Sequence, residues 1–230
     1  MKSDQQLKDF YNGEYVDRFS RRHESDDRLV ALTRLIKVGE SGSVVDLACG
    51  NGLLMDALSP RVKSYTGVDF SQAFIDAADE RKTALGITNA NFVCADIEQY
   101  CSAHARTYDA AFALDFSEHV LDEDWLRMLA SIRTCLKSRG TLYLHTPNAD
   151  FIIEKMKANN FILKQFPEHI AVRNIAENAA LLERAGFELV AVRSIAHYYN
   201  SLRWLHSLSY IPIVGKYFEA RVFIEAAAPA

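Results

Sequence analysis

The sequence predicts an α/β fold: a doubly wound, Rossmann-like sheet of seven mostly parallel strands, with helices on both faces and an N-terminal helical cap. From residue 43 onward, short apolar runs alternate with helical stretches. Strands separated by helices favour a parallel sheet. A chain of 230 residues, 49% of them hydrophobic, also has enough apolar material for a core of this kind.

Residues that typically cap or end helices mark the boundaries of individual elements. Ser71 is a suitable N-cap for a helix that Gly86 can end, because glycine tolerates the left-handed conformation. A later helix starts near Asp122 and stops before Gly140, with apolar residues three or four positions apart. In chain order we expect strand 44–48, helix 53–58, strand 65–68, helix 71–86, strands 91–95 and 109–114, helix 122–139, strand 141–146, helix 174–185, and strands 187–195 and 221–225.

Two stretches lie outside this alternation and predict the domain organisation. Residues 1–42 form the helical cap, with a helix over 26–37 that has an apolar face. Residues 43–230 form the core, with an insertion at 149–172 that is too long for an ordinary connection. We expect the insertion and the N-terminal segment to cover a small-molecule site together.

Composition excludes several function classes. There are 26 Lys and Arg residues against 30 Asp and Glu, a net charge of −4, so no strong field attracts nucleic acid or anionic lipid. There is no run of about 18 apolar residues that would cross a membrane. The first six residues contain no apolar core of a secretion signal, which favours a cytoplasmic location. The four cysteines show no C-x-x-C pairing and are expected to be buried free thiols.

Acidic residues occur at the ends of the first four predicted strands: Asp46, Asp69, Asp96 and Asp115. Ligands of an open parallel sheet bind at the carboxyl ends of its strands. Any one of these acids also suits helix capping or a turn. Together they favour a ligand with hydroxyl and cationic groups, because a carboxylate accepts hydrogen bonds from a ribose diol and repels phosphate.

The loop after the first strand, residues 48–52, contains two glycines that let backbone N–H groups approach a ligand closely. The dinucleotide-binding fingerprint requires a third glycine at position 55, where the chain has Met55. No phosphate-binding P-loop string occurs. NAD and ATP sites of these two kinds are therefore not indicated.

These stretches resemble class I S-adenosylmethionine-dependent methyltransferases over about residues 40–190. Residues 44–52 are similar to the first motif of that family, 67–71 to its second-strand motif and 96–97 to its adenine-contacting pair. At Ala48 many members have glycine. The resemblance implies S-adenosylmethionine as cofactor, with these contacts: Asp46, Ala48, Gly50, Asn51, Gly52, Asp69, Phe70, Asp96, Ile97, Leu114 and Asp115.

Residues 114–120 and 144–148 resemble small-molecule O- and N-methyltransferases, above all the ubiquinone-biosynthesis O-methyltransferase group. Residues 137–140 depart from the usual Pro-Gly-Gly turn. The function implied is methyl transfer to O or N of a small-molecule acceptor. Nucleic-acid methylation is an alternative, although the Asn/Asp-Pro-Pro-aromatic string of amino-group methylases is missing. Another alternative is a regulatory partner that binds S-adenosylmethionine without turnover.

His119 is the candidate catalytic base, because it follows the fourth strand and imidazole titrates near neutrality. It also suits a structural role that orients Glu118. The spacing of Asp115, Glu118 and His119 resembles the acid-x-x-Glu-His metal site of some quinone-biosynthesis members. We expect no metal, because the same string occurs in relatives without one.

The expected acceptor-binding residues are Tyr11, Tyr15, His145, His169 and Tyr198, each with ordinary packing as its alternative. Tyr198 opens an aromatic stretch up to residue 214 that suits an acceptor pocket, a homodimer face or a contact with a membrane surface. The sequence leaves these three roles open.

Overall fold

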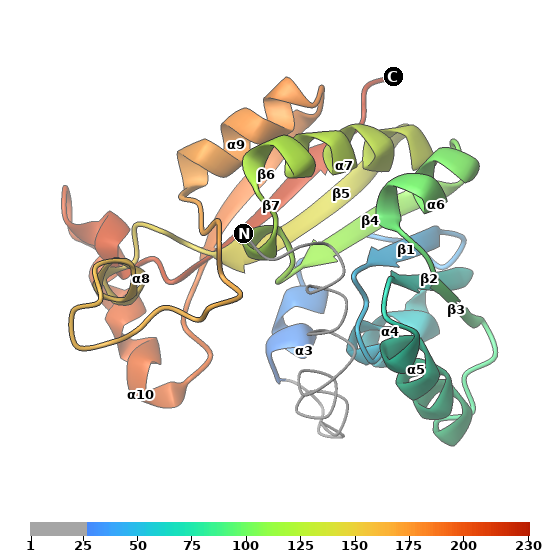
Figure 1. The fold of residues 1–230 in the computed structure, drawn as a ribbon, viewed down its shortest axis with the longest axis horizontal. Coiled ribbons are helices and arrows are strands. Elements are labelled where there is room, and N and C mark those ends of the chain that lie inside the picture. The colour runs from blue at the N-terminus through green and yellow to red at the C-terminus, as the bar shows by residue number, and fades with distance from the viewer. Residues whose placement is uncertain (1–26) are drawn as a thin grey trace. The chain divides into compact units, whose positions relative to one another are not determined.

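The computed structural model describes residues 27–230, which form helices and strands in near alternation (Figure 1). In chain order these are α3 (Asp27–Thr33), β1 (Ser43–Leu47), α4 (Leu53–Leu58), β2 (Ser64–Asp69), α5 (Gln72–Ala84), β3 (Ala90–Cys94), α6 (Ile97–Ala103), β4 (Tyr108–Leu114), α7 (Asp122–Cys135), β5 (Leu136–Pro147), α8 (Ile152–Ala158), α9 (Ile175–Arg184), β6 (Glu188–Ile195), α10 (Asn200–Arg203) and β7 (Arg221–Ala227).

Seven strands form the sheet, in the order β3-β2-β1-β4-β5-β7-β6. The strand β1 pairs in parallel with β2 and β4, and β2 pairs in parallel with β3. The last strand, β7, runs antiparallel to both β5 and β6. The predicted Rossmann-like sheet of seven mostly parallel strands is confirmed.

The chain divides into two compact units. The first contains the residues up to Phe112 together with Thr134–Lys137, and the second contains Ala113–Arg133 and Ser138–Ala230. The expected organisation as a cap over 1–42, a core over 43–230 and an insertion at 149–172 stays a prediction.

In the first unit, helices pack on the strands that begin the sheet. The helix α5 contacts β2 and β3, and α4 and α6 each contact β2. The strand β1 is almost entirely buried, as its continuous apolar run predicts. Arg61 donates hydrogen bonds to the carbonyls of Thr33 and Ile36, where the chain leaves α3. The helix therefore ends at Thr33, four residues before the predicted end.

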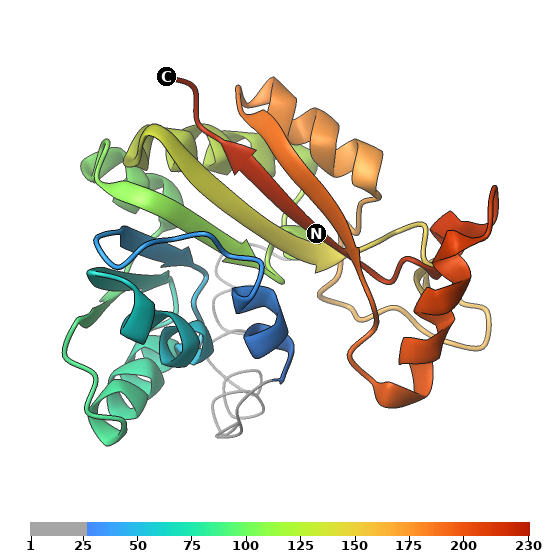
Figure 2. The same ribbon diagram turned by 180° about the vertical axis from the view of Figure 1, so that it is seen from behind.

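In the second unit, α7 and α9 lie on the same face of β5, β7 and β6 (Figures 1 and 2). Apolar side chains between these layers are buried, among them Trp125 and Leu129 on α7 and Leu182 on α9. Asn174 caps α9 through a reciprocal capping box with Glu177.

Two further helix predictions are wrong. The helix α7 ends at Cys135, and not near Gly140, because Arg139 has a φ of 57° that a right-handed helix excludes and Leu136 already begins β5. The helix α6 was not predicted at all, and Asp96 caps it. Of the cysteines, all four are free, but Cys94 is exposed because it ends β3, an edge strand.

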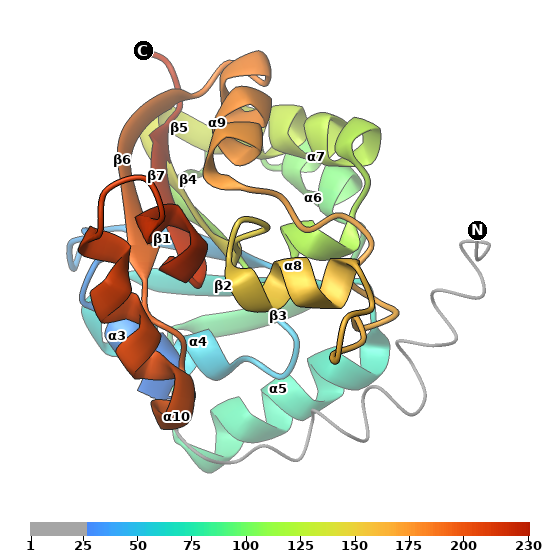
Figure 3. The same ribbon diagram turned by 90° about the vertical axis from the view of Figure 1, so that its left-hand side faces the viewer.

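The insertion contains α8, which lies beside the chain between α10 and β7 (Figures 1 and 3). The ammonium of Lys155 on α8 is 5.6 Å from the ring centroid of Tyr217 in that later segment. No helix of the described residues is long and apolar enough to cross a membrane.

Candidate active site

The loop after β1 adopts the left-handed conformation at three positions. The φ angles are 56° at Ala48, 53° at Gly50 and 75° at Gly52. A Cβ atom at Gly52 would lie 2.8 Å from the ring of Phe92, whereas a Cβ at Gly50 would meet nothing within 4 Å. Gly52 is therefore required by internal packing, and Gly50 borders open space where a ligand can approach the backbone.

Asp69 ends β2 and connects this loop to the next one. Its Oδ2 accepts a hydrogen bond from Gly50 N at 3.0 Å, and its Oδ1 accepts one from Ser71 N at 2.9 Å. Burial raises the pKa of Asp69 to about 6, against the lowering effect of these backbone hydrogen bonds. Each carboxylate oxygen has a second lone pair, so Asp69 can still accept from the hydroxyls of a ribose.

Asp46 lies deeper, on β1, with 4% of its surface exposed. The hydroxyl of Tyr65 donates a hydrogen bond to its carboxylate. Burial raises the pKa of Asp46 to about 7, the Tyr65 bond lowers it and the charge of Asp69 raises it. Asp46 therefore has a hydrogen-bond partner within the protein, Tyr65. Its predicted role, a contact with S-adenosylmethionine, did not include this bond.

The other predicted donor contacts of the first unit have varied surroundings. Asn51 and Ile97 are buried, and Phe70 is 37% exposed. Asp96 is exposed, and its Oδ1 accepts a hydrogen bond from Gln99 N at the start of α6. The capping role that the sequence left open for Asp96 is therefore present.

In the second unit, β4 ends at the half-buried Leu114, and the structure brings three predicted residues together beyond it. Nδ1 of the fully buried His145 is 2.9 Å from Oδ1 of Asp115, and the Tyr198 hydroxyl is hydrogen bonded to Nε2 of the same imidazole. Arg221 Nη1 lies 3.3 Å from Oδ1 of Asp115. Sequence reasoning missed Arg221, whose only signal was a basic residue beginning the last predicted strand.

His119 lies in the short 3-10 turn Ser117–His119 after β4, and its Nδ1 is 2.9 Å from the carbonyl oxygen of Glu168. Because a carbonyl only accepts, Nδ1 carries the proton and Nε2 is the basic nitrogen. Burial lowers the pKa of His119, against the raising effect of that hydrogen bond. The His169 ring packs edge to face on it at 5.1 Å between centroids, and burial together with His119 lowers the pKa of His169 to about 4.

Glu118, His119 and His169 have potential metal-ligating atoms that all lie within 4.8 Å of one another. Glu118 is 1% exposed and accepts a hydrogen bond from Thr146 Oγ1 at 3.1 Å. Burial, and then the charge of Asp115, raise the pKa of Glu118 to about 8. Because a metal ligand must be deprotonated, the raised pKa of Glu118 opposes cation binding at this cluster. The metal-free site stays a prediction.

Tyr11 and Tyr15, the N-terminal candidates, lie outside the described residues. The donor contacts predicted in the glycine loop and at the ends of β2 and β3 belong to the first unit. The second unit contains the contacts predicted at the end of β4, the candidate base His119, and the predicted acceptor contacts His145, His169 and Tyr198. All of these roles stay predictions.

Comparison with known proteins identifies the class. The sequence profile of the methyltransferase domain matches residues 14–192. A ubiquinone biosynthesis O-methyltransferase of Coxiella burnetii is 29% identical over 162 residues, which cover 68% of this chain and 67% of that one. One of Saccharophagus degradans is 26% identical over 153 residues, covering 64% and 63%. A second Coxiella relative is matched over only 44% of its length, so the acceptors of these relatives are not by themselves those of this chain.

Solved structures agree in fold. Magnesium protoporphyrin IX methyltransferase from Synechocystis, with bound S-adenosylhomocysteine, has a TM-score of 0.70 at 18% identity, covering 97% of this chain and 98% of that chain. A [4+2]-cyclase has a TM-score of 0.71 at 16% identity, covering 98% and 96%. The same fold therefore hosts more than one chemistry, and the likeness shows the fold alone.

The fold and the matched profile define an enzyme of the class I, S-adenosylmethionine-dependent methyltransferases. The chain belongs to the methyltransferase domain family, because that profile covers most of its length.

Proposed function

We propose that this enzyme transfers a methyl group from S-adenosylmethionine to a hydroxyl oxygen of a small-molecule acceptor. Binding of the methyl donor is supported by Asp69, a buried carboxylate at the end of β2 that also accepts a hydrogen bond from the glycine loop. The choice of oxygen over nitrogen is supported by the relatives, which are named O-methyltransferases of ubiquinone biosynthesis. We propose a phenolic or catechol hydroxyl as the acceptor type.

The donor supplies an electrophilic methyl group on a sulfonium, and the protein has to bind and orient it. Asp69 would accept hydrogen bonds from the ribose hydroxyls, and Phe70 would pack on the adenine. The backbone around Gly50 would approach the amino-acid end of the donor, because no side chain fills that space. Alignment of this kind can lower the barrier by about 7–11 kcal/mol.

The acceptor hydroxyl loses a proton when its oxygen gains the methyl group. His119 is the predicted base, and its Nε2 is the nitrogen able to accept that proton, since Nδ1 is bonded to the Glu168 carbonyl. His145, His169 and Tyr198 are proposed to contact the acceptor. A cytoplasmic location and a homodimer are proposed from the sequence alone, and no observation favours a nucleic-acid acceptor.

The test is methyl transfer by the purified protein from methyl-labelled S-adenosylmethionine to 3,4-dihydroxybenzoate as a catechol probe. An amine of similar size serves as the control acceptor. We expect a labelled methyl ether and no labelled amine. If only the amine becomes labelled, the methylated atom is nitrogen and the proposal of an oxygen acceptor is wrong. Binding of S-adenosylhomocysteine without product from a wider panel of phenols and catechols would instead support the non-catalytic alternative.

A further inference from the structure

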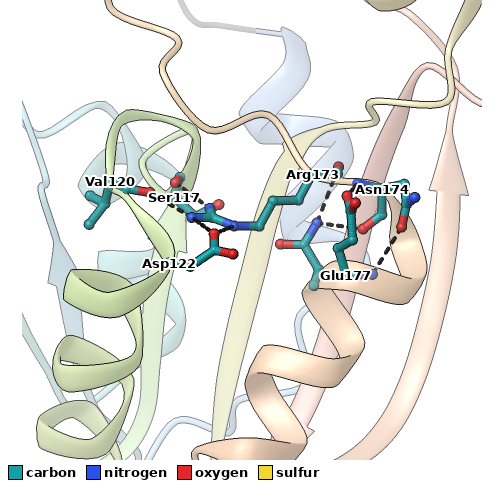
Figure 4. Close-up of polar contacts among 7 residues, drawn as sticks. Ser117, Val120, Asp122, Arg173, Asn174 and Glu177 are labelled. Carbon is teal, nitrogen blue, oxygen red and sulfur yellow. Dashed lines mark hydrogen bonds and ion pairs between the residues drawn. The ribbon is translucent and has the colours of Figure 1, made fainter.

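Arg173 lies at the carboxyl end of the insertion, and 4% of its surface is exposed (Figure 4). Its Nη1 donates to the carbonyl of Ser117 at 2.7 Å and its Nη2 to the carbonyl of Val120 at 2.6 Å. Its Nε donates to Oδ1 of Asp122 at 2.8 Å. The three nitrogens of one guanidinium thus contact the turn that follows β4 at its start, middle and end.

The backbone of Arg173 joins the two ends of the insertion. Its carbonyl oxygen accepts a hydrogen bond from Ala149 N at 3.1 Å, so the insertion begins and ends at one place. The Asn178 side chain also reaches that carbonyl from α9, at 3.4 Å. Arg173 therefore stands at the base of the insertion, with its side chain directed into the turn.

Two further hydrogen bonds connect the same two segments. The N–H of Ala171 donates to the carbonyl of Glu118 at 3.0 Å, and His119 Nδ1 is bonded to the carbonyl of Glu168 at 2.9 Å. The end of the insertion, residues 168–173, thus bonds to the turn at residues 117–122. This turn carries the candidate base, so the insertion sets both its backbone and its imidazole.

We propose that Arg173 is a positioning residue for methyl transfer: it holds the turn 117–122, and through it His119, in register with the end of the insertion. The inference rests on the proposed function, because it assigns Arg173 to the turn that carries the predicted base. The planar fork of a guanidinium can satisfy two carbonyls and a carboxylate at once. The ammonium of lysine cannot reproduce that geometry.

The test compares Arg173→Lys with Arg61→Lys, a matched control. Arg61 also donates to two backbone carbonyls, at 2.8 and 3.2 Å, but these are the carbonyls of Thr33 and Ile36 in the first unit. Hydrogen exchange is measured at the amides of Val120 and Ala171, which bond to the Ser117 and Glu118 carbonyls. Turnover of the catechol probe and affinity for S-adenosylhomocysteine are measured in parallel.

For Arg173→Lys we expect both amides to exchange about tenfold faster or more, and kcat to fall about tenfold or more. The affinity for S-adenosylhomocysteine should change less than about threefold, and KM less than kcat. Arg61→Lys should leave the two amides and kcat unchanged. Unchanged exchange and kcat in folded Arg173→Lys overturn the inference, as does an equal loss of kcat in both variants.

Asp122→Asn provides a second variant if Arg173→Lys does not fold. The Asp122 side chain is 65% exposed and its replacement leaves both carbonyl bonds in place, so the protein should fold. We expect faster exchange at Val120 and Ala171, by a smaller factor than for Arg173→Lys. Exchange at the wild-type rate would overturn the inference. A wild-type protein that methylates no acceptor would count against the proposed function, while the exchange rates still decide whether Arg173 holds the turn.

Discussion

The Asp69 carboxylate accepts a hydrogen bond from the backbone N–H of Gly50 at 3.0 Å. The acid that ends β2 therefore holds the loop that ends β1, and the two strands pair in parallel beneath it. A single side chain thus connects the two motifs that the sequence assigns to the donor. Its substitution affects both a predicted ligand contact and the shape of the loop.

Asp69→Asn should weaken S-adenosylhomocysteine binding at least about tenfold, because asparagine has a single acceptor oxygen, which cannot accept from both Gly50 and Ser71, and its amide nitrogen cannot accept from a ribose hydroxyl. Calorimetry measures the affinity. Asp109→Asn is the matched control, since Asp109 also accepts a backbone N–H, from Ser43, but has no predicted donor contact. Equal affinities in wild type and folded Asp69→Asn would remove Asp69 from the site.

The two loop glycines should respond differently to alanine. Gly52→Ala should lower the free energy of unfolding by about 2–5 kcal/mol, because its Cβ would lie 2.8 Å from Phe92 and φ at this position is left-handed. Gly50→Ala should lower it by only about 1–2 kcal/mol, the cost of its left-handed φ, since its Cβ would meet nothing within 4 Å, and should weaken binding of the methyl donor. Urea unfolding measures the stability of both variants, and calorimetry measures their affinity for S-adenosylhomocysteine. Full affinity in Gly50→Ala would show that the loop does not contact the methyl donor at this position.

Asp46 should make the protein less stable as pH rises from about 4 to about 7. Its folded pKa, raised by burial to about 7, lies above the ordinary value of 3.8, so the folded state binds more protons in this window. Such a group contributes up to about 1.4 kcal/mol per pH unit. Urea unfolding of Asp46→Asn across that range should give a shallower decline than wild type. Parallel curves for the two proteins would contradict the assignment.

His119→Ala should lower turnover of the catechol probe by about 100-fold or more, with the affinity for S-adenosylhomocysteine within a fewfold. The reason is loss of the basic Nε2, which the Glu168 bond leaves as the proton acceptor. Steady-state kinetics and calorimetry separate the two effects. Intact turnover with reduced stability would give His119 the structural role instead.

Exhaustive chelation should leave turnover unchanged. Burial raises the pKa of Glu118 to about 8, and this opposes cation binding beside His119 and His169, because a metal ligand must be deprotonated. Activity is measured after treatment with EDTA and again after adding Mg²⁺ or Zn²⁺. Loss on chelation with recovery on one of these ions would establish a metal site at this cluster.

The sheet, the glycine loop and the acids at the strand ends could all be predicted from the sequence. These features depend on local patterns: the apolar runs of β1 and β4, the glycines at 50 and 52, and the position of Asp69 directly after a strand. Family resemblance then assigned the donor. The boundaries that failed, at the end of α7 and at α6, depend on a left-handed Arg139 and on a cap at Asp96 that the apolar pattern does not mark.

Which polar groups contact one another could not be predicted from the sequence, because the contacts join residues far apart in the chain. His145 and Tyr198 are 53 positions apart in the chain, and Arg173 is 56 positions from Ser117. Such contacts depend on the register of β5, β7 and β6 and on the path of the insertion, which no short stretch of sequence encodes. Burial in that packing then raises the pKa of Glu118 and lowers the pKa of His169, because it disfavours the charged form of each group.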